Sequence, residues 1–162
     1  MDFERTQHVG HYGVVFTLIQ FTVGPGDAAS LRTLRFPEIT KGDYEVTRLI
    51  EETYDRMLAQ GRPCRMTLAV SNRLGRNTAD LLNDQRVRVG GVVSMFSGKA
   101  VTEVFGPVIG GVAGMVAGGK AKQGLPTYHV GDVIVSIDAQ VAGGIGPQRS
   151  SAAILLKNNG EG

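Results

Sequence analysis

The chain has 162 residues, of which 42% are hydrophobic and 20% charged, and its formal net charge is +2 at pH 7. This composition predicts one ordinary domain or two small ones with a packed core, and it excludes a mainly disordered chain. The weak charge and the absence of Trp give no reason to expect a nucleic-acid partner.

The first 27 residues contain a strand signal followed by a turn. The start, MDFERTQHVG, lacks the apolar region of a signal peptide, so we expect no leader and a cytoplasmic protein. Residues 12–23 (YGVVFTLIQFTV) are rich in β-branched and aromatic residues and predict a strand or a hairpin. The sequence GPGD at 24–27 is a strong turn signal.

Residues 43–60 (DYEVTRLIEETYDRMLAQ) give the clearest helix signal in the chain. Asp43 is placed to cap this helix, and Gly61 with Pro63 ends it. The apolar face repeats at helical spacing and contains Val46, Leu49, Ile50, Thr53, Met57 and Leu58.

Residues 64–70 (CRMTLAV) alternate like a strand, which predicts that the only cysteine, Cys64, is a buried structural thiol. A single cysteine excludes an intramolecular disulfide and a zinc site built from cysteines. Residues 71–85 are polar and predict a linker with one short helical turn. Residues 86–96 predict a strand, a glycine bend and a second strand, and residues 99–105 predict another strand.

Two further elements are predicted near the end of the chain. A strand with one strongly apolar side is expected after Gly131-Asp132, and a reversal is expected at Asp138-Ala139. Residues 148–160 (QRSSAAILLKNNG) predict a short helix that Ser150 or Ser151 can cap.

Three segments of the second half resemble the PDZ family: AVTEVFG at 100–106, GLPTYHVGDVIVSIDAQVAGG at 124–144 and SSAAILLKNNG at 150–160. GHYGVVFTL, YEVTRLI and GRPCRMTLAV in the first half are similar to the same family, but the Gly-Asp-strand element between them is missing. The resemblance implies an α+β fold of two small PDZ-like units, each a partly open β-barrel or sandwich with a late amphipathic helix. Residues 1–75 would be a degenerate unit, 76–85 a linker and 86–162 the second unit. A different α+β unit in 1–75 stays open, as does the strand that closes the second unit.

The PDZ resemblance also implies a function, that of a non-catalytic scaffold or adaptor that binds an extended or C-terminal peptide by β-strand addition. Backbone N–H groups of a glycine-rich bend would hold the peptide carboxylate. Arg149 would favour acidic or hydroxyl groups on the ligand, and Ala153 would face the same pocket. The resemblance implies a protein or peptide partner, no cofactor, and binding by Val89, Gly90, Gly91, Val92, Val93, Arg149, Ala153, Tyr12, Gly13 and Val14.

A stripe of glycines supports an alternative function. Gly106, Gly110, Gly114 and Gly118 are four residues apart and would form one smooth stripe on a helix, as in glycine zippers. The protein would then be a self-associating or membrane-associating assembly protein, and a homo-oligomer is possible under either function. The uncharged run 104–119 contains Pro107 and is shorter than the ~20 residues of a spanning helix, so we expect no stable membrane span. The simpler interpretation is a loop or a short helix packed on a sheet.

No catalytic motif is present in the sequence, and we predict that the protein is not an enzyme. His8 and His11 are three residues apart and have no acid or cysteine cluster nearby, so no metal site is predicted. His129 precedes a core strand and is interpreted as structural. The acids on the outer side of the 43–60 helix (Glu51, Glu52 and Asp55) are interpreted as solvated.

Overall fold

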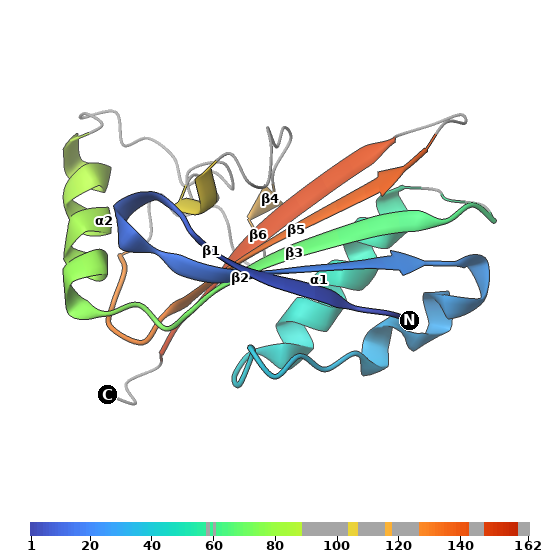
Figure 1. The fold of residues 1–162 in the computed structure, drawn as a ribbon, viewed down its shortest axis with the longest axis horizontal. Coiled ribbons are helices and arrows are strands. Elements are labelled where there is room, and N and C mark those ends of the chain that lie inside the picture. The colour runs from blue at the N-terminus through green and yellow to red at the C-terminus, as the bar shows by residue number, and fades with distance from the viewer. Residues whose placement is uncertain are drawn as a thin grey trace.

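The computed structural model of the chain describes residues 1–57, 59, 61–88, 104–106, 116–117, 127–142 and 148–158. Within these residues the fold is α+β, and it is built on one open sheet of antiparallel strands (Figure 1). The strands, in spatial order, are β1 (Glu4–Val9), β2 (Val15–Val23), β3 (Cys64–Ser71), β5 (Val133–Val141) and β6 (Arg149–Leu156). A two-residue strand, β4 (Val116–Ala117), pairs in parallel with β6.

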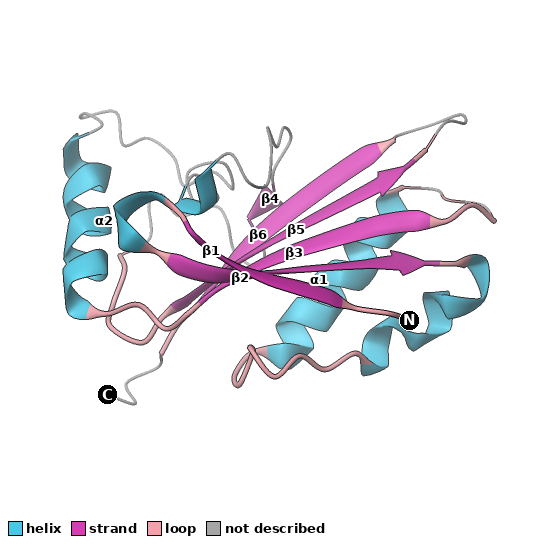
Figure 2. Cartoon of the chain, in the orientation of Figure 1, coloured by secondary structure: helices cyan, strands magenta, loops and turns pink. Residues whose placement is uncertain are grey.

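The helices lie at different parts of this sheet. Figure 2 shows α2 (Arg76–Arg88) at one end, while α1 (Asp43–Arg56) and the 3₁₀ helix η2 (Pro25–Thr33) lie toward the other. A second 3₁₀ helix, η1 (His11–Gly13), forms the turn between β1 and β2.

One side of the sheet, called here the first face, is apolar along β3 and β5 and over most of β2 and β6. Alternate residues of a strand point to opposite sides, so Ile19, Phe21 and Val23 of β2 share this face. Val46, Leu49 and Ile50 of α1 pack against it and are buried with them. Strands β3, β5 and β6 add Cys64, Met66, Leu68, Val70, Val135, Ile137, Ala139, Val141 and Ala152.

On the opposite side, called here the second face, the apolar residues that the structure describes gather at the end that α2 covers. Phe16 and Leu18 of β2 pack there with Ala79 and Leu82 of α2. Phe105 meets Phe16 edge-on, with ring centroids 4.8 Å apart. Among the residues that the structure describes, the second face therefore has the smaller core, at one end of the sheet.

At its other end the second face carries two rows of polar residues. One row crosses four strands as Thr22, Arg65, Gln140 and Arg149, and all four are exposed. The neighbouring row consists of Gln20, Thr67, Asp138 and Ser151.

Several predicted elements are confirmed. The helix predicted over 43–60 is α1, although the structure ends it at Arg56 and places Gly42 at its N-cap in place of Asp43. The strand predicted over 64–70 is β3, and Cys64 is fully buried within it. A strand follows Gly131-Asp132, and Gly131 makes the bend with φ 91°.

The predicted C-terminal helix is wrong, because residues Arg149–Leu156 form strand β6. Ala and Leu favour a helix locally, but β6 pairs with β5 over its whole length and buries side chains on both faces. The reversal predicted at Asp138-Ala139 is wrong for the same reason, since β5 continues through both residues to Val141.

The predicted linker 76–85 is also wrong, because these residues form most of α2. Arg86–Arg88 continue that helix, so the strand predicted over 86–96 does not begin there; residues 89–96 lie outside the described residues. Val104 and Phe105, predicted as strand, are in a 3₁₀ turn. Of the predicted strand or hairpin over 12–23, residues Val15–Val23 form β2.

The two separate PDZ-like units are not confirmed. Strand β3 from the first predicted unit pairs with β5 from the second over seven residues, from Cys64↔Val141 to Val70↔Val135. Both halves of the chain therefore contribute to one continuous sheet.

Candidate functional site

Strand β1 forms one edge of the sheet and pairs only with β2 in the part of the chain that the structure describes. Five of its six residues are exposed. The opposite edge differs, because β4 pairs there with Ala152 and Ala153 of β6. An edge strand presents backbone donors and acceptors that another extended chain can bind.

The register of the β1–β2 hairpin shows which backbone groups of β1 point outward. The Gly10 N–H donates to the Val14 carbonyl at 2.7 Å, so these two opposed residues form a hydrogen-bonded pair. In antiparallel strands, such pairs alternate with pairs whose backbone groups point away from each other. Counting back from Gly10, the residues whose backbone groups face β2 are Glu4, Thr6 and His8. The residues whose N–H and C=O groups face outward are Arg5, Gln7 and Val9.

Apolar side chains are exposed where this edge ends. Val9 is 69% exposed, and Val15, directly opposite it in the hairpin, is 36% exposed. Tyr12, in the turn between them, is 38% exposed. Such a group beside unpaired backbone is typical of a surface that contacts another chain.

Of the predicted binding residues that the structure describes, Val14 and Ala153 belong to the same buried cluster, whereas Arg149 lies far from the β1–β2 turn. Tyr12, Gly13 and Val14 lie in the β1–β2 turn, with φ 57° at Tyr12 and 74° at Gly13, and Val14 is buried. Arg149 lies in the row of Thr22, seven residues along β2 from Val15, so it is offset from that turn by roughly 23 Å along the strands and by three strands across the sheet.

Neither Arg149 nor Ala153 forms the wall of a peptide groove. Both lie on strand β6, so the helical wall that the prediction required is absent from this segment. Arg149 donates through Nε to Asp138 Oδ1 at 2.9 Å, and Ala153 is fully buried in the second-face core. The predicted carboxylate loop, Val89–Val93, lies outside the described residues.

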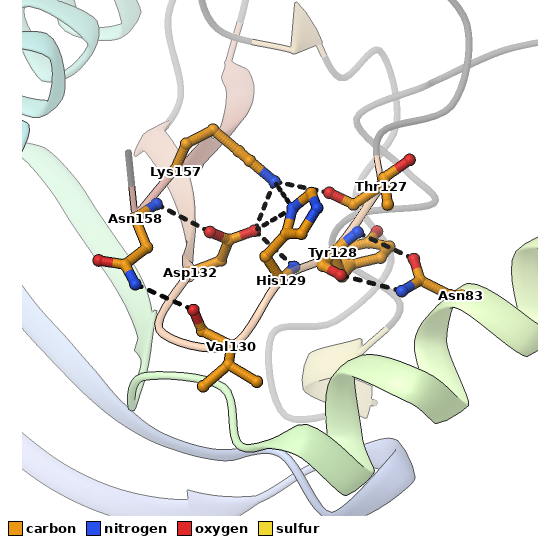
Figure 3. Close-up of polar contacts among 8 residues, drawn as sticks. All are labelled: Asn83, Thr127, Tyr128, His129, Val130, Asp132, Lys157 and Asn158. Carbon is orange, nitrogen blue, oxygen red and sulfur yellow. Dashed lines mark hydrogen bonds and ion pairs between the residues drawn. The ribbon is translucent and has the colours of Figure 1, made fainter. Parts of the chain in front are cut away.

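A second candidate site is a polar cluster around Asp132, at the start of β5 (Figure 3). Asp132 is fully buried, and its carboxylate is held from both sides. Oδ1 accepts the backbone N–H of Asn158 at 2.8 Å. Oδ2 accepts the backbone N–H of His129 at 2.9 Å and the ammonium group of Lys157 at 2.6 Å. The charge is therefore compensated inside the protein, as a buried carboxylate requires.

The same ammonium group fixes the tautomer of His129. Besides Asp132, Lys157 Nζ contacts the Thr127 carbonyl at 2.6 Å and His129 Nδ1 at 2.8 Å. An ammonium group only donates, so Nδ1 accepts and the neutral imidazole carries its proton on Nε2. The His129 side chain is 63% exposed, so this Nε2–H group belongs to an accessible ring.

The turn over 127–132 is held from several elements. Asn83 of α2 makes two hydrogen bonds to the Tyr128 backbone, at 2.9 and 2.8 Å. Asn158 donates to the Val130 carbonyl at 3.1 Å. Between α2 and this turn lies an open hollow of about 860 Å³, whose polar lining includes Arg76, Asp80, Asn83, Thr127, His129 and Lys157.

Sequence reasoning missed this cluster. His129 was interpreted as structural, and Gly131-Asp132 only as a bend. The available signal was a charged residue directly before a strongly apolar strand, because a buried carboxylate requires a partner. Lys157 follows another apolar run, but the sequence alone does not show that the two runs pair.

Other features of the described residues add no further site. Burial raises the pKa of the Cys64 thiol to about 11, which disfavours the reactive thiolate. No cluster of three His, Cys, Asp or Glu residues suited to a metal is found in the described part of the chain. Within those residues, no helix has the length and apolar character to cross a membrane.

The glycine stripe is only partly described. Gly106 has φ 70°, outside the right-handed helical range, so it is not a regular helical position. The predicted stripe of four glycines on one helix therefore does not extend to Gly106. Gly110, Gly114 and Gly118 lie outside the described residues.

Comparison with known proteins gives no relative for this chain. No family model matches it, and neither a curated protein nor a solved structure matches it. The function is therefore inferred from the geometry of the molecule itself.

Proposed function

We propose that this protein is a non-catalytic interaction module, a scaffold or adaptor, that binds an extended peptide as an added strand beside β1. The observation that carries the proposal is the outward direction of the backbone N–H and C=O groups at Arg5, Gln7 and Val9. Three residues at alternate positions offer six backbone groups to one extended ligand.

This ligand class is the one that the PDZ resemblance implies, but its position differs. The resemblance suggests a groove beside a late helix, and Arg149 and Ala153 lie on a strand instead. Edge β1 offers the same backbone chemistry without that helix. The exposed side chains of Val9 and Val15 favour a peptide with an apolar residue beside them.

A pair of proline substitutions at adjacent positions tests the proposal. Gln7→Pro removes an N–H group that points outward, and proline is tolerated at such edge positions. Thr6→Pro removes an N–H group that bonds β2, and is expected to destabilise the hairpin. Peptides would first be selected on an array with the unaltered chain, and their dissociation constants would then be measured by fluorescence polarisation.

We expect Gln7→Pro to weaken peptide binding roughly tenfold or more while the melting temperature changes little. Two sets of N-methylated peptides would be compared, one methylated at the odd-numbered amides and the other at the even-numbered amides. Only the set whose methylated amides face β1 should lose binding. Unchanged affinity in Gln7→Pro with an intact fold would overturn the proposal. Sedimentation of the free protein is the companion measurement, since a dimer that Gln7→Pro dissociates would show that a second copy, not a peptide, occupies the edge.

A further inference from the structure

The wall of the hollow beside α2 is a rigidly held turn that carries an oriented histidine. Asn83, Lys157 and Asn158 each bond a different backbone group of the turn over 127–132. From the chain segment before α2, Leu74 also donates its N–H to the Asp132 carbonyl at 2.9 Å and accepts the Gly131 N–H at 2.8 Å. Groups fixed in this way can bind a ligand without first being ordered.

His129 is directed by its neighbours much as a ligand-binding histidine is. The Lys157 ammonium occupies Nδ1, and the Asp132 carboxylate in turn holds that ammonium. The free position of the ring is therefore the Nε2–H donor. All three hydrogens of Lys157 have acceptors already, so this lysine is a positioning residue and does not bind a ligand itself.

Arg76 supplies a positive charge to the same hollow. It lies at the start of α2 and lines the hollow together with His129. In the part of the chain that the structure describes, its guanidinium has no ion-pair partner, whereas Lys157 is paired with Asp132. Two acids of the described residues line the hollow. Asp132 is paired with Lys157, whereas Asp80, one helical turn after Arg76, has no such pairing with Lys157.

We propose that this hollow binds a small ligand through a carboxylate or phosphate group, held by the Nε2–H of His129 and the guanidinium of Arg76. Both groups are donors that suit the oxygens of such an anion, and Arg can bind two of them at once. The hollow is larger than the anion, so the remainder of the ligand lies against α2. The proposal does not depend on peptide binding at β1.

The test uses inorganic phosphate and acetate as probes, added to the full chain at constant ionic strength. Binding would be followed by NMR through the backbone amides of 127–132 and the side-chain Nε–H of Arg76. We expect saturable shifts with at least one anion, and saturation by only one of them identifies which chemistry the hollow takes. Arg76→Ala and His129→Leu should each weaken this binding roughly tenfold or more.

Two control variants separate a specific site from general attraction. Arg73→Ala removes a cation only three residues from Arg76 whose guanidinium bonds Thr40 outside the hollow, and it should change the affinity less than twofold. His129→Gln keeps an N–H donor and should retain more affinity than His129→Leu, with folding checked by circular dichroism. The proposal is overturned if neither anion gives saturable shifts, or if Arg73→Ala weakens binding as much as Arg76→Ala.

Discussion

The two faces of the sheet are built from the same strands and differ in what they bury. The first face is apolar over its central strands and lies under α1 and η2, with Phe21 and Leu68 fully buried. Within the described residues, the second face is apolar near α2, and its other end carries exposed polar residues such as Arg65 and Gln140. In the described part of the chain, the first face therefore supplies most of the apolar burial, while the second carries more polar groups.

The two faces also differ in the titratable groups that they bury. Near α2, the second-face core adjoins a buried carboxylate, an ammonium group and an exposed imidazole. On the first face, the buried thiol of Cys64 has no opposite charge among the described groups that shift its pKa. Apolar burial keeps a group neutral, whereas the cluster near α2 keeps Asp132 and Lys157 paired as ions.

The largest expected effect comes from neighbouring residues on opposite faces. Phe21→Ala on the first face should lower the free energy of unfolding by about 3–5 kcal/mol, because it leaves a large cavity in the main core. Thr22→Ala, one residue later and exposed on the second face, should lower it by about 1 kcal/mol or less. Urea denaturation of both variants measures the difference, and equal losses would contradict the contrast between the faces.

Asp132→Asn is expected to have the next largest effect. The amide of the variant has a single acceptor oxygen, so in either orientation its NH2 group faces a donor: the Asn158 N–H, or the His129 N–H and the Lys157 ammonium. The free energy of unfolding should fall by roughly 2–4 kcal/mol. Asp80→Asn is the matched control, since Asp80 is exposed, and it should leave stability nearly unchanged. A loss no larger than that of the control would show that the cluster is not needed for folding.

The smallest of these effects concerns pH and Cys64. Burial raises the pKa of this thiol from 9.0 to about 11, so the folded state retains a proton that the unfolded state releases. The stabilising contribution is fully present below pH 9 and is lost as the pH rises toward 11, by roughly 2–3 kcal/mol in total. Burial also raises the pKa of Tyr54, which acts in the same direction.

Urea unfolding between pH 8 and 11 would measure this dependence. Cys64→Ala should be less stable at pH 8 than the unaltered chain, but its stability should fall less steeply above pH 9. Parallel pH profiles for the two proteins would contradict the role assigned to the thiol.

Local sequence pattern determined the elements whose apolar side chains repeat at regular spacing and are buried on one face. The helical spacing of Val46, Leu49 and Ile50 predicts α1, and the alternation after Cys64 predicts β3 together with its buried thiol. The bend at Gly131 is also predicted locally, because glycine readily adopts the positive φ that the turn requires. The peptide-binding class stays a prediction, since none of these locally predicted elements bears on it.

Tertiary structure decided the remainder, because it depends on which segments become neighbours. Residues of β6 carry helix-favouring Ala and Leu, and only pairing with β5 makes them a strand. The same pairing brings Lys157 to Asp132, 25 residues earlier in the chain, and thereby orients His129. The outward backbone groups of β1 follow from its place at the edge of the sheet, which no local pattern reveals. Hydrophobic periodicity fixes what a segment buries, whereas partners distant in sequence fix where its polar groups meet.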